Sequence, residues 1–225
     1  MGDENQSAKI AKLPGWGIMI LDLPWIDILT GLWKIGRKVI RGMANEGVYE
    51  TLEYESTLEI QNRKGTRATF KKRKKIRYLQ DNIIAYQDQA WGDGQILIRY
   101  RCSPGKAVDR YRLGHKTHIL ISLREVKNKG DEDEFNIQRG IRNGFLRSEE
   151  QWETEISHPT DHLKIRLLFP KGRYPRRVVV LESDRQRSRV LPASAIRTLP
   201  DGRCQVTWEQ ANPRLHERYI LKWTW

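Results

Sequence analysis

The run VYETLEYESTLEIQNRKGTRATFKKRKKIRY, residues 48–78, decides the fold class of this chain. Apolar and polar residues alternate over 48–60 and again over 68–78, which is the period of a β-strand. Between the two stretches, Arg63-Lys64-Gly65 has the composition of a tight turn. The run therefore predicts a β-hairpin whose turn holds Gly65 in a left-handed conformation.

The expected register gives this hairpin one apolar face and one charged face. The pairs on the apolar face are Ile60 with Ala68, Leu58 with Phe70, and Leu52 with Ile76. The pairs on the charged face join opposite charges, Glu55 with Arg73 and Glu53 with Lys75.

Two lysines break this pattern, because the alternation places Lys72 and Lys74 on the apolar face. We expect them to lie at a sheet edge, to extend their ammonium groups to solvent, or to face a partner.

The rest of the chain also favours strands. They are expected at 83–87, 95–102, 116–126, 134–142, 152–156, 163–169, 176–182, 204–209 and 219–225. The strands 116–126 and 134–142 are expected to pair as a hairpin. We therefore predict a mainly β, β-sandwich-like fold with two packed β units. The expected divisions are a polar tail with a helix (1–45), a β-rich domain (46–148) and a C-terminal β-sandwich-like domain (149–225).

Residues 24–41 are predicted to form an N-terminal amphipathic helix, since apolar residues recur at helical spacing and basic residues gather near its end. This helix would cover the protein's own sheet, dock in a partner's groove, or lie on an anionic membrane. The residues that would bind a partner or membrane are Trp25, Ile28, Leu29, Leu32 and Trp33.

Composition excludes several classes of protein. The chain has 225 residues, and 41 Lys and Arg against 28 Asp and Glu give a formal net charge of +13. Eight Trp and eight Tyr indicate a packed core, which excludes a fully disordered chain, and two Cys exclude a disulfide-rich mini-protein. The excess of basic charge indicates solubility and non-specific association with anions, and it motivates nucleic-acid binding as an alternative function.

Two basic groups are candidate anion-binding or nucleic-acid-binding surfaces. Nine of the fifteen residues over 63–77 are basic, and a second basic group with interleaved aromatic residues follows residue 163. Alternatively, the first group pairs with glutamates across the hairpin, and the second is a solvated surface. The candidate residues are Lys71, Lys72, Arg73, Lys74, Lys75, Arg77, Arg173, Tyr174, Arg176 and Arg177.

Catalytic and metal-binding signatures are weak. His158 and His162 have a spacing that suits a metal only on a helix, and Pro159 disfavours a helix there. Asp109 with Glu125-Val126-Lys127 resembles a nuclease arrangement at a spacing that is common by chance. We expect no cofactor and no metal site, and the sequence favours binding over catalysis.

Both Cys102 and Cys204 fall in strand-like runs and are expected to be buried, reduced thiols. The N-terminal residues are acidic and polar, unlike a signal peptide. We therefore expect a cytoplasmic protein, with peripheral membrane attachment through helix 24–41 as the alternative.

The runs GTRATFKKRKKIRYLQDNIIAYQDQAWGDG, ISLREVKNKGD and LPDGRCQVTWEQANPRLHERYILKWTW resemble a group of uncharacterised bacterial β-rich proteins. The resemblance covers about residue 45 to the end and implies no activity. Similar β-rich modules are fused or adjacent to bacterial signalling and defence proteins. We therefore expect a non-enzymatic basic interaction module, with a protein partner, in such an assembly. The alternatives are a nucleic-acid-binding protein that uses the basic strands and a membrane-associated effector anchored through helix 24–41.

Overall fold

Nearly all regular structure in the described part of the chain is β-strand, which confirms the mainly β prediction. The computed structural model describes residues 47–225, so helix 24–41 and its candidate binding residues lie outside the described part. The described part contains no helix long and apolar enough to span a membrane. Its elements are β1(Tyr49–Ile60), β2(Arg67–Tyr78), β3(Ile83–Ala90), β4(Gln95–Ser103), β5(Lys106–Leu113), β6(Lys116–Lys127), β7(Glu132–Arg142), β8(Glu149–Glu155), β9(Thr160–Phe169), β10(Arg177–Glu182), β11(Arg187–Val190), η1(Ala193–Ala195), β12(Ile196–Thr198), β13(Cys204–Ala211) and β14(Arg218–Thr224).

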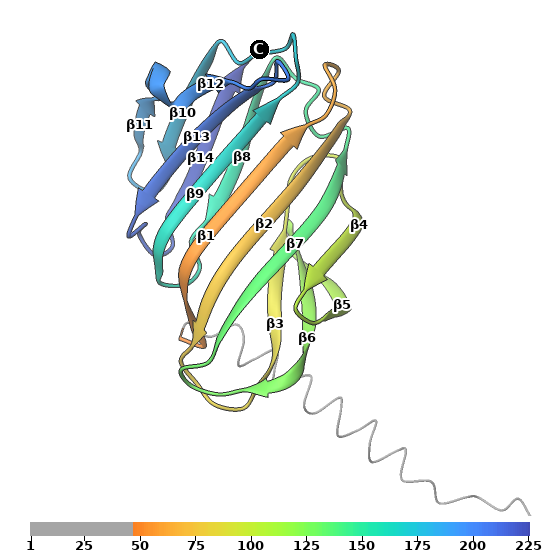
Figure 1. The fold of residues 1–225 in the computed structure, drawn as a ribbon, viewed down its shortest axis with the longest axis vertical. Helices are drawn as coiled ribbons and strands as arrows, with labels where there is room; N and C mark the ends of the chain where they lie inside the picture. Colours follow the sequence, from red (N-terminus) through yellow and green to blue (C-terminus); the bar gives the residue numbers. More distant parts are fainter. Residues whose placement is uncertain (1–46) are drawn as a thin grey trace, which may run out of the picture. The chain divides into compact units, whose positions relative to one another are not determined.

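The strands form three sheets (Figure 1). The largest has seven strands in the order β12-β13-β9-β1-β2-β7-β4. Two smaller sheets, β11-β10-β14-β8 and β3-β6-β5, pack against it through separate sets of buried apolar residues. The result is a sandwich in which one large sheet faces two small ones.

Each small sheet forms a separate hydrophobic core with the large sheet. Under the four-stranded sheet, Trp152, Leu221 and Trp223 pack with Leu58 and Phe169 of the large sheet. Under the three-stranded sheet, the buried residues include Tyr86, Ile119 and Ile121, which pack with Ile76 and Phe135. Burial of these side chains supplies most of the force that holds the layers together.

The predicted hairpin forms, and most of its register is confirmed. Leu58 pairs with Phe70 and Glu55 with Arg73, as expected. A register shift between Thr51 and Glu53 moves the next pairing, so that Thr51 rather than Leu52 lies opposite Ile76. The prediction for Leu52 is wrong because a bulge adds one residue to β1 and reverses which side chains face the core beyond it.

The predicted hairpin between 116–126 and 134–142 is also wrong. These segments belong to different sheets, since β6 pairs with β3 and β5, whereas β7 pairs with β2 and β4. Glutamates of β7 lie opposite the cations of β2, which stabilises the observed partner. Three strands that the sequence analysis missed, β5, β11 and β12, are also present.

Strands from both sides of the expected boundary near 148 join in the large sheet. Strand β1 pairs with β9 in parallel, with Thr51 opposite Thr160 and Leu58 opposite Leu167. Buried residues of both segments also share one core. The segments before and after residue 148 therefore contribute strands to the same sheet, and they do not form two separate sandwiches.

The hairpin turn gives the first prediction. Gly65 has φ +71°, and a Cβ there would lie 1.7 Å from the backbone oxygen of Phe145. Gly114 has φ +59°, but its Cβ would meet nothing within 4 Å. We expect Gly114→Ala to lower the free energy of unfolding by about 1 kcal/mol, the cost of a left-handed residue. Gly65→Ala should lose at least about 2 kcal/mol more, because the backbone must move. Urea unfolding measures both, and equal losses would contradict a rigid contact at Phe145.

Candidate ligand-binding cavity

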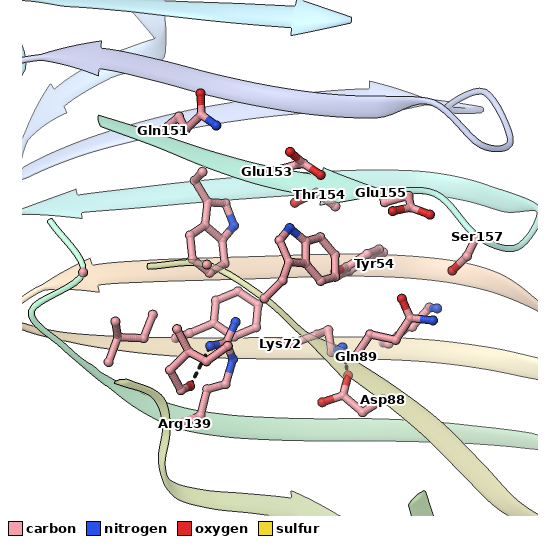
Figure 2. Close-up of a pocket in the computed structure, with 18 of the residues that line it drawn as sticks. Tyr54, Lys72, Asp88, Gln89, Arg139, Gln151, Glu153, Thr154, Glu155 and Ser157 are labelled. Atoms are coloured by element: carbon pink, nitrogen blue, oxygen red, sulfur yellow. Dashed lines mark hydrogen bonds and ion pairs between the residues drawn. The ribbon is translucent and has the colours of Figure 1, made fainter. Parts of the chain in front are cut away.

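A cavity of about 340 Å³ lies between the neighbouring edges of the two small sheets. Its sides come from β3 and β8, which are edge strands of their sheets, and its floor comes from β1, β2 and β7. Figure 2 shows Lys72, Asp88 and Arg139 on one side of this space and Glu153 and Glu155 of β8 on the other. The volume falls in the range of small-molecule sites.

A buried ion pair joins β2 to β3 at the floor. The Nζ of Lys72 donates a hydrogen bond to Asp88, and both side chains are buried. The Oη of Tyr100 donates a second hydrogen bond to Asp88 at 2.9 Å. Burial alone would lower the pKa of Lys72, but the Asp88 carboxylate raises it. Lys72 therefore stays protonated, and the pair ties the large sheet to the three-stranded one.

Arg139 is a second buried cation, and only 3% of it is exposed. Its Nη1 donates a hydrogen bond to the backbone oxygen of Ile96 at 2.7 Å. The guanidinium carbon lies 4.8 Å from the centroid of the Phe70 ring and 5.8 Å from that of Trp152. Within residues 47–225 no carboxylate forms an ion pair with Arg139. Burial lowers its pKa to about 10, so it remains charged at neutral pH.

Lys74 is the third cation, and it is 7% exposed. Its Nζ lies 5.1 Å from the ring centroid of Tyr49 and 5.4 Å from that of Tyr54. Nothing in the described part of the chain gives it a hydrogen bond or an ion pair. Burial, followed by the charge of Lys72, lowers the pKa of Lys74 to about 7. The side chain thus exchanges its proton near physiological pH.

Aromatic groups with unused polar atoms complete the lining. His158 stacks on Tyr49 with 3.9 Å between ring centroids. Burial, with a smaller effect of Lys74, lowers the pKa of His158 to about 3, so the ring is neutral. Its Nδ1 and the Nε1 of Trp152 are buried without hydrogen-bond partners in the described region. Both atoms are thus polar groups that are shielded from solvent and have no partner in the described region.

Most carboxylates at the rim are neutralised by nearby cations. Glu155 forms an ion pair with Lys116, and Asp93 lies 3.2 Å from the Nη1 of Arg147. Glu150 accepts a hydrogen bond from the backbone N–H of Arg147, and burial raises its pKa. The rim therefore carries less net negative charge than its number of carboxylates suggests, whereas the floor holds Lys74 and Arg139 without an ion pair in the described region.

The structure divides the first predicted basic group between two faces. Lys72 and Lys74 are buried, which confirms their predicted place on the apolar face. Strand β2 is internal to the large sheet, so neither lysine lies at an edge. On the outer face, Arg73 forms ion pairs with Glu53, Glu55 and Glu134, Lys75 with Glu132, and Arg77 with Glu50 and Glu132; Lys71 is exposed.

The second predicted group meets the first at the hairpin turn and at Glu55, which pairs with both Arg73 and Arg166. Arg173 donates a hydrogen bond to the backbone oxygen of Arg63 and lies 3.6 Å from the ring centroid of Trp225. Tyr174 donates a hydrogen bond to the backbone oxygen of Gly202 at 2.7 Å, and Arg176 and Arg177 are exposed. Neither this group nor the outer face of β2 contributes to the cavity.

The weaker sequence candidates do not form sites. His158 stacks on Tyr49, whereas His162 lies 3.5 Å from Glu209. Glu125 pairs with Lys127, and Asp109 accepts the N–H of Arg110. Residues 47–225 contain no group of His, Cys, Asp and Glu that could hold a metal ion. Both cysteines are free thiols, with Cys204 buried and Cys102 half-buried.

The cavity residues Asp88 and Arg139 are not among the residues predicted from the sequence, although the sequence carries a signal for each. Asp88 alternates with Tyr86 and Ala90, and all three are buried. Arg139 likewise follows Phe135 and Ile137 at every second position of β7. A charged residue at an inward position of a strand is the signal that could have identified both.

No family model matches the chain, and no curated protein matches it. This agrees with the resemblance to uncharacterised bacterial β-rich proteins. Among solved structures, a presumed protease from Parabacteroides distasonis is similar over 80% of this chain and 41% of its own, at 9% identity and TM-score 0.47. An M1 zinc metallopeptidase from Deinococcus radiodurans is similar over 78% and 42%, at 8% identity and TM-score 0.44. The chain thus spans about two fifths of each of these structures.

The buried amine of Lys74 gives the second prediction. The pKa of Lys74 in the folded protein, about 7, lies below the ordinary lysine value of 10.5. Burial of the ammonium group therefore costs stability below pH 7, and this cost falls as the pH rises from 7 to 10.5. We expect Lys74→Met to be more stable than the wild type at pH 6. The difference should shrink by roughly 1.4 kcal/mol per pH unit between about 7 and 10. Urea unfolding across pH measures it, with the exposed Lys71→Met as control. A pH-independent difference would contradict the shifted pKa.

Proposed function

We propose that this chain is a binding module that holds a small organic anion in the cavity between β3 and β8. Arg139 is the observation that carries the proposal. A buried guanidinium without a carboxylate partner is costly in a folded protein, and an anionic ligand would supply the missing partner.

The charge balance at the floor supports the same proposal. One carboxylate, Asp88, faces three cations, Lys72, Lys74 and Arg139. Its ion pair with Lys72 uses that negative charge. The ligand's anionic group would therefore lie beside Arg139, which has no carboxylate partner within residues 47–225.

The apolar part of the lining supports a ligand with an aromatic or apolar body. Phe70, Trp152 and Tyr54 all line the cavity, and Arg139 already stacks against two of these rings. The half-buried Glu153 at the β8 side suits a hydrogen-bond donor at the outer end of the ligand. An aromatic carboxylate fits this combination.

Roles in a bacterial signalling or defence assembly, in nucleic-acid binding, and in membrane attachment stay predictions. The ion pairs of Arg73, Lys75 and Arg77 leave β2 with less free positive charge than its sequence suggests. Ligand binding in the cavity is compatible with an interaction module whose partner responds to the bound molecule.

The proposal predicts that benzoate raises the melting temperature of the full chain and that the rise depends on Arg139. Stabilisation should grow with the logarithm of concentration and reach about 2.7 kcal/mol at one hundred times Kd. Arg139→Met should abolish the rise, because the counter-charge is gone. The matched control is Arg142→Met, which removes an exposed arginine from the same strand. Differential scanning fluorimetry measures the shift, and an equal shift in both variants would place benzoate elsewhere.

A further inference from the structure

The cavity is lined by an amine, that of Lys74, which has no role in the proposed anion site. Lys74 lines the cavity, and its Nζ is held by no hydrogen bond or ion pair within residues 47–225. When such an amine loses its proton, its lone pair is free to attack an electrophile in the same space. Lys72, two residues along the same strand, differs because Asp88 holds its ammonium group.

The groups around Lys74 favour its unprotonated form. Lys72 lies beside it on β2, and Tyr49, Tyr54 and Tyr86 face the same space from β1 and β3. Burial raises the pKa of all three phenols, so they stay neutral. His158 is neutral as well, and Asp88 is shared with Lys72 and Tyr100. A desolvated lysine next to another cation is a recognised arrangement for an amine nucleophile.

The neighbouring Arg139 indicates what kind of electrophile would enter. A ligand whose anionic group pairs with Arg139 lies in the cavity that Lys74 also lines. If that ligand carries an aldehyde or ketone group, the amine and the carbonyl carbon are confined together, which strongly favours their reaction.

We propose that Lys74 is a nucleophile that forms an imine with the carbonyl group of an anionic ligand in this cavity. This inference rests on the proposed anion site, which brings the ligand in. The Nζ lone pair forms a C–N bond to the carbonyl carbon, and a proton passes from nitrogen to the carbonyl oxygen to give a carbinolamine. The C–O bond then breaks, water leaves with the second nitrogen proton, and a C=N bond remains. Amine and carbonyl thus give imine and water without an oxidant.

The test uses the full chain with 4-formylbenzoate as the probe and sodium cyanoborohydride to reduce the imine to a stable amine. Peptide mass spectrometry then compares labelling at Lys74 with labelling at Lys71, the exposed lysine of the same strand. At pH 7 we expect Lys74 to be labelled at least about tenfold faster, since about half of it is unprotonated against roughly one exposed lysine in 2,500. The rate at Lys74 should rise up to about pH 7 and level off above it.

Two further probes separate this inference from the proposed function. Benzoate has the anion without the carbonyl group, and benzaldehyde has the carbonyl group without the anion. Both proposals hold if benzoate slows labelling and benzaldehyde reacts more slowly than 4-formylbenzoate. If benzoate stabilises the protein but Lys74 is labelled no faster than Lys71, imine formation is overturned and the anion site stands. If benzaldehyde labels Lys74 as fast and benzoate does not compete, the nucleophile stands and the anion site is overturned.

Lys74→Arg keeps a cation but has no amine to form an imine, so the label at this position should disappear. Lys71→Arg should leave labelling of Lys74 unchanged. The comparison of positions within the wild-type protein decides the question even if Lys74→Arg fails to fold.

Discussion

The two-sided pairing of β1 is the constraint on which the rest of the structure depends. This strand is antiparallel to β2, its neighbour in sequence, and parallel to β9, which lies far along the chain. Glu55 of β1 links both neighbouring strands, because it forms ion pairs with Arg73 of β2 and with Arg166 of β9. With β1 in the interior, the large sheet is wide enough to carry two small sheets on one face. The cavity exists because the edges of those sheets, β3 and β8, do not meet.

Charge at the floor of the cavity sets a balance between stability and reactivity. A protein built for stability alone would fill these positions with apolar residues, because buried cations without partners are unfavourable. This chain keeps Lys72, Lys74 and Arg139 there and supplies one carboxylate, Asp88. The alternation that makes β2 a strand requires a side chain at positions 72 and 74 to face inward, but it does not require lysine. The presence of lysine at both positions is therefore explained by the cavity that these side chains line, and not by the requirements of the sheet.

The local pattern predicted the hairpin and placed Lys72 and Lys74 on its apolar face, because a two-residue period and one left-handed glycine specify both. It did not predict that the two ammonium groups are buried in the interior of the structure. It did not predict the bulge beside Leu52, because nothing in the alternation of glutamate and apolar residues shows which residue is extra. From the sequence, β6 and β7 were expected to pair because they are neighbours in the chain. In the structure β7 pairs with β2, whose cations match the glutamates of β7 although the two strands are much farther apart in sequence. Lys74 was found from the sequence, but Asp88 and Arg139 come from strands whose positions depend on the assembled sheets. The site was therefore only partly predictable.

The parallel contact between β1 and β9 also determines when, during synthesis, β1 can gain its second neighbour. Thr51 and Thr160 are 109 residues apart (160 − 51), so one edge of β1 has no partner until that length has been synthesised. At about 5–20 residues per second, this takes roughly 5–20 s on the ribosome. During that time one edge of β1 is unpaired. The strand carries Glu53, Glu55 and Glu59, whose negative charges repel the same strand of a neighbouring nascent chain. The arriving strand brings Arg166, which forms an ion pair with Glu55, so a glutamate that keeps copies apart also favours the correct partner.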